Sequence, residues 1–373
     1  LFIYNDVDTN FNNLTANKLK LTKLNDSVFN SNEININGLT GFGINVIDKQ
    51  DLANNKNGVY KISTYYNNQL VNSIHYDGFL FEESILINTL IDYKYYLNNK
   101  ERIIKLFKSP GNTLSFYENL NNGLINKTKG YSEFKIKISD IKNNNTYVII
   151  PLNSEKKLIQ QNKKVKSKIK YNKLINNDLE SNFNIENYQI SIPKNTFLKN
   201  VNLLIELKND SLKVINPTIP VFKNIKIVFP NYFNKKGNYL ANMDQNNNEY
   251  FITSKLNSKN NFETKTKRLG TFFIKNDSVL PLIKSLSFKK GDWISNKNEI
   301  KFKILDKETG IKKYRGSING KWVLFEYEYK KDEISYSFDQ YYIKKSRNEV
   351  EIYVEDMVGN INILKTSFYR KAN

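Results

Sequence analysis

The chain has 373 residues, and 57 Lys and Arg against 37 Asp and Glu give it a formal net charge of +20. It has no cysteine and one histidine, His75, which excludes disulfides, cysteine nucleophiles, thiolate metal sites and histidine-rich zinc motifs. This composition argues against a hydrolase, and no stretch approaches the roughly 18 consecutive apolar residues of a membrane-spanning helix.

The N-terminal segment, residues 1–37, is predicted to be a strand and linker that follow an upstream domain. The sequence starts at Leu1 with neither an initiator methionine nor a basic and apolar leader. We therefore expect that Leu1 is not the native start and that a signal peptide lies outside this chain.

The first β unit is predicted at residues 38–153. Its segment GINVIDK at 43–49 echoes KFKILDK at 301–307, and FKIKISD at 134–140 matches VEIYVED at 350–356. Each matching pair ends in a polar turn that leads to another strand. Apolar and polar residues that alternate are typical of half-buried strands, so this internal repeat predicts two sandwiches of one type.

An insertion in the first unit, residues 81–108, is predicted to be helical. Its sequence FEESILINTLIDYKYYLNNKERIIKLFK lacks Pro and Gly and has apolar residues near helical spacing, and SPGN at 109–112 should end it. We expect one or two short helices that cover the sandwich, an interpretation favoured over a partner-binding helix.

Residues 154–187 are predicted to be a basic linker. The densest basic run of the chain, EKKLIQQNKKVKSKIKY at 155–171, lies there. A solvated linker is favoured over a site for an anionic partner, which stays open. Nucleic acid is disfavoured, because no basic helix or aromatic strand motif accompanies the positive charge.

Two further β units complete the chain, a middle domain at 188–276 and a C-terminal sandwich at 277–373. Alternation is clearest at Ile300, Phe302 and Ile304, and DSVLP at 277–281 is predicted to be the hinge between the units. The fold class is therefore mostly β: tandem immunoglobulin-like antiparallel β-sandwich modules with a short helical insertion in the first. The Cys…Trp…Cys hallmark of antibody domains is absent.

The candidate groups for chemistry are few. His75 is predicted on the solvent side of a strand, and the sequence offers it no metal-binding companions. Carboxylates suited to calcium occur at strand ends beside Asn-rich turns, but turn formation explains them better, and no EF-hand loop exists. These residues are Asp48, Asp51, Asp140, Asp306 and Glu308. We predict no catalytic, cofactor-binding or metal-binding residue in this chain.

The two tryptophans, Trp293 and Trp322, suggest a carbohydrate platform. Packing in the core or at a sheet edge is favoured for Trp322, because it follows the Asn319-Gly320 turn at the start of a predicted strand. The tripeptide GFG at 41–43 is too short for a phosphate-binding loop. No spacing of Asp and Glu selects a pair for glycoside cleavage.

Several segments, in order along nearly the whole chain, resemble a known family. They are GFGINVIDKQDLANNKNGVYKISTYY at 41–66, FEE at 81–83, INTLIDY at 87–93, SIPKNTF at 191–197, RLGTF at 268–272, NGKWVLFEYEY at 319–329 and VEDMVGN at 354–360. They resemble the region that follows the catalytic domain in the long gram-negative form of lysostaphin-like zinc metallopeptidases (peptidase family M-twenty-three), which cleave peptidoglycan. The start, LFIY at 1–4, resembles the strand that leaves that catalytic domain.

The resemblance implies a role but transfers no catalytic residue. The family's zinc site resembles a His and an Asp from one motif and a His from a His-x-His motif, which this sequence lacks. Zinc is therefore implied only for a peptidase domain outside this chain.

The expected function is a non-catalytic accessory or targeting region of a cell-envelope zinc metallopeptidase, in the periplasm or at the outer membrane. Such a region would position the peptidase or dock on envelope proteins, peptidoglycan or an anionic wall polymer. The alternative is a stand-alone binding or scaffold subunit of an outer-membrane or periplasmic assembly.

Overall fold

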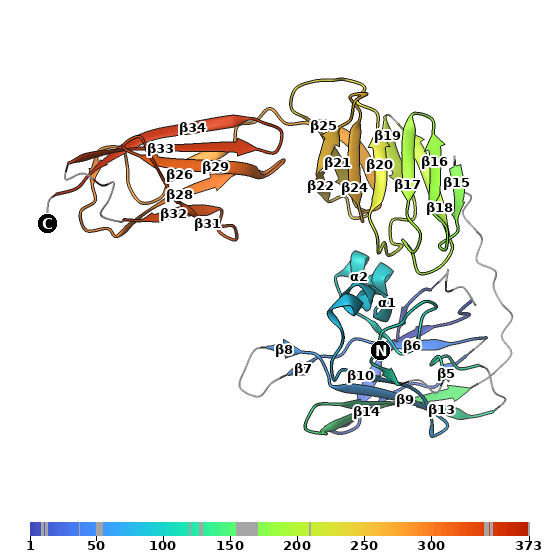
Figure 1. Cartoon of the computed structure of the whole chain (residues 1–373). Helices are drawn as coiled ribbons and strands as arrows, with labels where there is room; N and C mark the ends of the chain where they lie inside the picture. The colour runs from blue at the N-terminus through green and yellow to red at the C-terminus, as the bar shows by residue number, and fades with distance from the viewer. Residues whose placement is uncertain are drawn as a thin grey trace.

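Three β units follow one another along the chain (Figure 1). The computed structural model describes residues 1–8, 11, 14–36, 38–49, 55–118, 121–126, 130–153, 171–208, 210–338, 343 and 346–371. Each unit has its own apolar core between two sheets, and we name them the first module (1–153), the second module (171–276) and the third module (277–371). The predicted fold class of tandem antiparallel β-sandwich modules is confirmed.

The first module consists of two main sheets and the helical insertion, which lies between β10 and β11 in the sequence. Its helices are η1 (Phe81–Leu86, 3-10), α1 (Ile87–Leu90) and α2 (Tyr93–Asn99). Its strands are β1 (Phe2–Tyr4), β2 (Asn17–Lys18), β3 (Leu21–Lys23), β4 (Val28–Ser31), β5 (Ile34–Asn35), β6 (Gly41–Ile44), β7 (Asp48–Lys49), β8 (Lys56–Asn57), β9 (Lys61–Tyr66), β10 (Gln69–His75), β11 (Ile104–Lys105), β12 (Tyr117–Glu118), β13 (Ser132–Ser139) and β14 (Asn145–Asn153). The sheets run β11-β6-β1-β2 and β12-β10-β9-β13-β14-β4-β3, β5 lies beside β14, and β7 pairs with β8.

The first module includes the N-terminal residues, contrary to the predicted boundary at residue 38. Strand β1 pairs antiparallel with β6, and the side chains of Phe2 and Tyr4 are 2% and 0% exposed. Strands β4 and β5 pair in parallel with β14. Residues 1–37 therefore supply core side chains and strands, because the apolar β1 is buried only when it lies in this sheet.

The helical insertion is shorter than predicted. Helix α2 ends at Asn99, and Lys100 takes a left-handed conformation with φ of 59°. Residues Ile104 and Lys105 then form β11, which joins the sheet beside β6. The apolar run after residue 100 suits a buried strand as well as a helix, and pairing with β6 decides between them.

The second module is a sandwich of a six-stranded and a five-stranded sheet. Its strands are β15 (Tyr171–Ile175), β16 (Ser181–Ile185), β17 (Tyr188–Ile192), β18 (Val201–Lys208), β19 (Ser211–Val214), β20 (Ile225–Phe229), β21 (Asn238–Met243), β22 (Glu249–Ile252), β23 (Ser254–Leu256), β24 (Phe262–Thr266) and β25 (Thr271–Asn276). The orders are β15-β18-β19-β25-β21-β22 and β16-β17-β20-β24-β23. Because β15 and β16 belong to these sheets, the predicted linker at 154–187 extends too far. Residues 154–170, which hold most of the basic run, lie outside the described residues.

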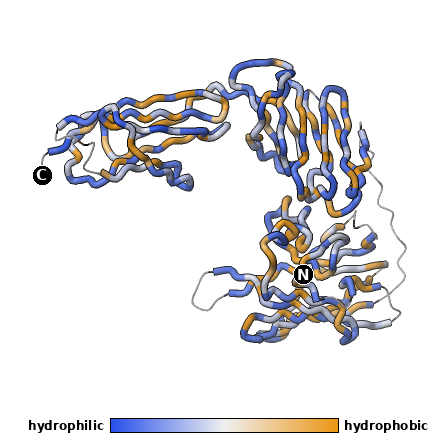
Figure 2. Tube along the Cα trace, viewed as in Figure 1, coloured by the Kyte–Doolittle hydropathy of each residue, from blue (hydrophilic) through white to orange (hydrophobic). Residues whose placement is uncertain are grey.

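The third module matches the predicted C-terminal sandwich. Its strands are β26 (Leu282–Ser285), β27 (Asp292–Trp293), β28 (Glu299–Leu305), β29 (Ile311–Ile318), β30 (Lys321–Val323), β31 (Glu326–Glu328), β32 (Glu333–Ser337), β33 (Arg347–Asp356) and β34 (Ile361–Tyr369). The sheets run β26-β28-β32-β31 and β27-β34-β33-β29-β30, so the chain changes sheet between β30 and β31. The predicted core residues Ile300, Phe302 and Ile304 are each 0% exposed. Figure 2 shows the alternation of apolar and polar residues along these strands.

One five-residue turn recurs at four hairpins, at residues 140–144, 244–248, 257–261 and 356–360. In each, the first side chain accepts hydrogen bonds from the backbone N–H groups of the third and fifth residues. The fourth residue has a positive φ and is Asn143, Asn247, Asn260 or Gly359. Asn and Gly tolerate that conformation best, so these turns use the asparagine-rich composition directly.

The first two modules touch through the helical insertion. Helices α1 and α2 lie on the side of the first module that faces the second (Figure 1). The Nδ2 of Asn246 in the second module donates a hydrogen bond of 2.8 Å to the backbone oxygen of Leu97 in α2. A Cβ added to Gly111 would lie 2.7 Å from the backbone oxygen of Leu198, which shows how closely the two backbones approach.

Candidate functional site at the junction of the second and third modules

The segment that joins the second and third modules is held by side chains of the third. It runs between β25 and β26, and Asn360 Nδ2 donates to the backbone oxygens of Asp277 and Val279 at 3.2 and 3.3 Å. Asn362 Nδ2 donates to the backbone oxygen of Pro281 at 2.8 Å. The predicted hinge is therefore in the predicted place, but its backbone is bonded to the module that follows it.

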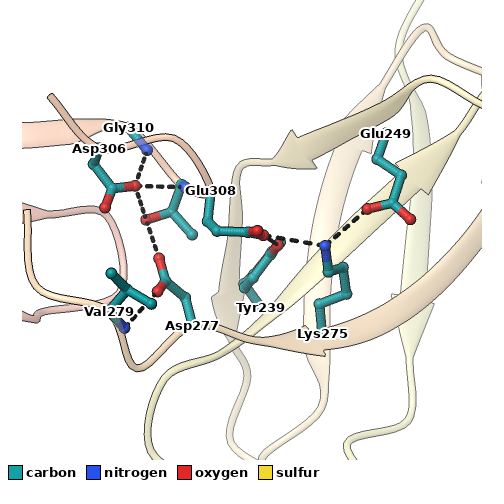
Figure 3. A network of polar contacts seen from close by, with 9 residues as sticks. Tyr239, Glu249, Lys275, Asp277, Val279, Asp306, Glu308 and Gly310 are labelled. Carbon is teal, nitrogen blue, oxygen red and sulfur yellow. Dashed lines mark hydrogen bonds and ion pairs between the residues drawn. The ribbon is translucent and has the colours of Figure 1, made fainter.

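A second set of contacts bridges the two modules directly. Lys275 Nζ in β25 lies 2.8 Å from Glu249 Oε2 in β22 and 3.1 Å from Glu308 Oε2 in the third module. The Tyr239 hydroxyl in β21 donates a hydrogen bond of 2.8 Å to the same Glu308 oxygen (Figure 3). We name these four residues the junction clamp. These hydrogen bonds from Tyr239 and Lys275 lower the pKa of Glu308, so its carboxylate stays charged.

A carboxylate cluster lies beside the clamp. One oxygen each of Asp277, Asp306 and Asp356 lies within 4.8 Å of the others, and Asp277 and Asp356 are 2% and 0% exposed. Desolvation raises the pKa of Asp277, and the negative charges of Asp306 and Asp356 act in the same direction. Ionisation of Asp277 in this position therefore costs free energy.

Neighbouring donors already engage this cluster. Asp277 Oδ1 accepts from Val279 N at 2.9 Å, and Oδ2 accepts from the Thr309 hydroxyl at 3.2 Å. Asp306 Oδ1 accepts from the backbone N–H groups of Thr309 and Gly310 at 2.8 and 2.9 Å. Three carboxylates could supply oxygen ligands to a hard cation such as Ca²⁺, but the cluster serves here to order the loops of the junction.

The donor set does not fit the zinc that the family resemblance implies for a peptidase. Zinc sites use His and Cys as well as carboxylates. Among the described residues, the grouped candidates are the three aspartates of the junction, and His75 lies in another module. No chemical step through zinc is therefore assigned to this chain.

The predicted calcium candidates separate in the structure. Asp306 and Glu308 reach the junction, whereas Asp140 orders a hairpin turn of the first module and Asp48 lies in β7. Asp51 lies outside the described residues. The preference for turn formation is correct for Asp140. Sequence reasoning missed Tyr239, Lys275, Asp277 and Asp356, because nothing in their local pattern distinguishes them from other strand-end residues.

His75 is the last residue of β10 and lies on the solvent side of the strand, as predicted, although its neighbours partly cover it. Its side chain is 25% exposed, its Nδ1 lies 3.2 Å from Glu118 Oε1, and Tyr60 contacts it edge to face. Glu118 also pairs with Lys61 at 2.8 Å. This group is a surface ion pair across neighbouring strands and carries no assembled catalytic relay.

The tryptophans and the glycine tripeptide are also placed. Trp293 and Trp322 are 58% and 55% exposed and lie on the two edge strands, β27 and β30, of one sheet. Edge packing is therefore correct for Trp322, and core packing is not. Residues 41–43 form the buried strand β6, where a Cβ on Gly41 would lie 2.5 Å from the Phe107 ring. This close approach, not a phosphate, accounts for the glycine.

Fold and junction together define a tandem array of β-sandwich modules joined by ordered polar contacts. Among the described residues, no helix is long and apolar enough to cross a membrane. No protein family and no curated protein matches the sequence.

Three solved structures illustrate the likeness in architecture. The chain is similar to fibronectin(III)-like modules of Clostridium thermocellum CbhA, with 7% identity and a TM-score of 0.20 over 95% of this chain and 94% of that one. It is similar to SGBP-B of the Bacteroides ovatus mixed-linkage glucan utilization locus, solved with a mixed-linkage heptasaccharide (10% identity, TM-score 0.17, 84% of this chain and 60% of that one). It is also similar to a 1.5-MDa bacterial ice-binding adhesin, with 7% identity and a TM-score of 0.19 over 85% of this chain and 89% of that one. At these identities the likeness concerns the fold alone.

Proposed function

We propose that this chain is a non-catalytic arm of a cell-envelope protein. The arm would hold the domains attached to it at a set distance and orientation. The observation that carries the proposal is the junction clamp, in which Lys275, Tyr239 and Glu308 join two modules through side chains. An arm with fixed joints confines an attached domain to a small volume and so raises its effective concentration at a target.

The finer proposal follows from the family resemblance. The attached domain would be a lysostaphin-like zinc metallopeptidase, and the arm would position it on peptidoglycan in the periplasm or at the outer membrane. The coding sequence upstream of Leu1 tests this directly, because a peptidase of this type requires a His-x-His motif there. An upstream region without that motif favours a stand-alone binding or scaffold subunit.

The rigidity of the junction can be measured with two spin labels. The chain contains no cysteine, so Lys213→Cys in β19 and Lys284→Cys in β26 would be the sole labelling sites. Double electron–electron resonance should give one narrow distance distribution. Lys275→Met should broaden it, because Glu249 and Glu308 then face each other without the cation between them.

The matched control is Lys265→Met on β24, which removes the same charge from an exposed position of the second module. It should leave the distance distribution unchanged. A broad distribution in the unmodified junction would refute the rigid arm. Targeting is tested separately by retention of the chain on purified peptidoglycan sacculi at low and high salt. Binding that depends on surface charge alone would be lost as the salt concentration rises.

A further inference from the structure

A hollow of about 310 Å³ lies at the edge of the third module, where the chain passes from β30 to β31. Trp322 and Leu324 line it, together with Glu326, Ser335 and Ser337. We propose that this hollow binds one pyranose unit of a neutral glycan. The proposal deepens the proposed envelope function and rests on it for the choice of glycan.

The strand pattern places the apolar wall of the hollow outside the core. Val323 and Phe325 are 3% and 1% exposed and point into the sandwich, so Trp322 and Leu324, which alternate with them, point outward. Trp322 and Leu324 are 55% and 62% exposed. The indole of Trp322 and the isobutyl group of Leu324 are apolar surfaces in contact with water. Covering them with the apolar face of a ligand removes that surface from water, which is favourable.

The opposite wall is polar in the manner that a sugar requires. Ser335 pairs with Glu326 across β31 and β32, so the hydroxyl and the carboxylate stand beside each other. A sugar ring presents an apolar C–H face and an edge of hydroxyl groups. The indole suits the face, while the serine hydroxyls and the Glu326 carboxylate suit the edge, which is how small-molecule sites divide their polar and apolar surface.

The charge around the hollow selects a neutral ligand. Lys301, the cross-strand neighbour of Ser335, pairs with Glu299 at 2.7 Å, which leaves Glu326 as the charge that lines the hollow. A carboxylate there repels an anionic wall polymer. Strand addition by a peptide is disfavoured as well, because the edge strand β31 carries Glu326 and Glu328, and charged residues on an edge oppose pairing.

Calorimetric titration of the whole chain with the tetrasaccharide of N-acetylglucosamine tests the proposal. We expect saturable binding with a dissociation constant in the millimolar range or below, as a shallow site gives. Trp322→Ala should weaken it at least about tenfold, Trp322→Phe should weaken it less, and Trp293→Ala, the matched exposed tryptophan, should leave it unchanged. In the Trp293→Phe variant, Trp322 is the only indole, so its fluorescence should change with the same dissociation constant.

Several results would overturn the glycan site. These are an absence of saturable binding, equal affinity of the Trp322→Ala variant, or binding restricted to an anionic polymer and lost with salt. Backbone amide shifts confined to β31 on addition of an extended peptide would indicate strand addition instead. The spin-label distances do not depend on Trp322, so the rigid arm can fail while the glycan site stands, and the reverse.

Discussion

A buried lysine in the first module gives the sharpest test of the packing. Lys105 in β11 is 6% exposed, and its Nζ donates a hydrogen bond of 2.5 Å to the Ser109 hydroxyl. Burial lowers its pKa from 10.5 to about 8, and the positive charge of Lys199 adds to this, while Asp92 opposes it. The buried ammonium therefore destabilises the folded first module at neutral pH.

The magnitude follows from the two pKa values. The difference between 10.5 and about 8 corresponds to about 3 kcal/mol of unfolding free energy at pH 7. Lys105→Met removes this cost but loses the hydrogen bond to Ser109, which contributes about 1 kcal/mol. We expect the variant to be more stable than the wild type by about 2 kcal/mol at pH 7.

The pH dependence gives a second, independent readout. The pKa of Lys105 is lower in the folded state than in the unfolded state. The unfolded state therefore binds more protons between about pH 8 and pH 10.5, and stability rises with pH in that window. Wild-type stability should gain about 2 kcal/mol from this group between pH 7 and pH 9.5, a gain that Lys105→Met lacks.

Urea unfolding followed by pulsed hydrogen exchange and mass spectrometry would report the first module separately from the others. Lys94→Met on the exposed face of α2 is the matched control. It should change neither the stability of the first module at pH 7 nor the dependence of that stability on pH. A Lys105→Met variant with lower stability at pH 7, or with the wild-type pH slope, would refute the account of a buried charge.

Three further predictions concern the third module, whose unfolding the tryptophan fluorescence reports. Asp277→Asn should stabilise the third module at pH 7 and not near pH 3. The carboxyl pKa of Asp277 is raised in the folded state, so stability is lost as the pH rises through that pKa. An equal effect of the substitution at both pH values would contradict this explanation. Gly316→Ala should cost about 1–3 kcal/mol, because the added Cβ would lie 2.2 Å from the Phe325 ring. Gly58→Ala, whose added Cβ meets nothing within 4 Å, should leave the stability of the first module unchanged when hydrogen exchange follows its unfolding. Asn360→Ala should broaden the spin-label distances across the junction, since its amide holds the connecting segment.

Alternation of residue types predicted strands β28 and β33 of the third module, but not the change of sheet between β30 and β31. Strand β28 shows why: its alternating residues Ile300, Phe302 and Ile304 all enter one core, so the local period and the global fold agree. The first module was predicted less well, since β1 has three residues and gains its place only by pairing with β6, about forty positions later. The end of the helical insertion was missed because Lys100, and not a glycine or proline, takes the left-handed conformation.

The candidate site was beyond prediction for a different reason. Lys275 and Glu308 are separated by 33 positions, and their pairing depends on how two modules with separate cores meet. In a chain with 57 Lys and Arg and 37 Asp and Glu, one such pair carries no local signature. Alternation defines the faces of a strand, but it says nothing about which polar residues at the ends of two sandwiches become neighbours.

The asparagine content connects composition to architecture. Asn143, Asn247 and Asn260 occupy the positive-φ position of the recurring turn, and Gly359 takes it in the fourth copy. Alanine at such positions would be strained by roughly 1 kcal/mol or more. The same turn supplies Asp356 and Asn360 to the junction, so the element that closes ordinary hairpins elsewhere also secures the joint between modules. A repeated local turn thus contributes to the joint between the modules, beside the side-chain contacts of the junction clamp.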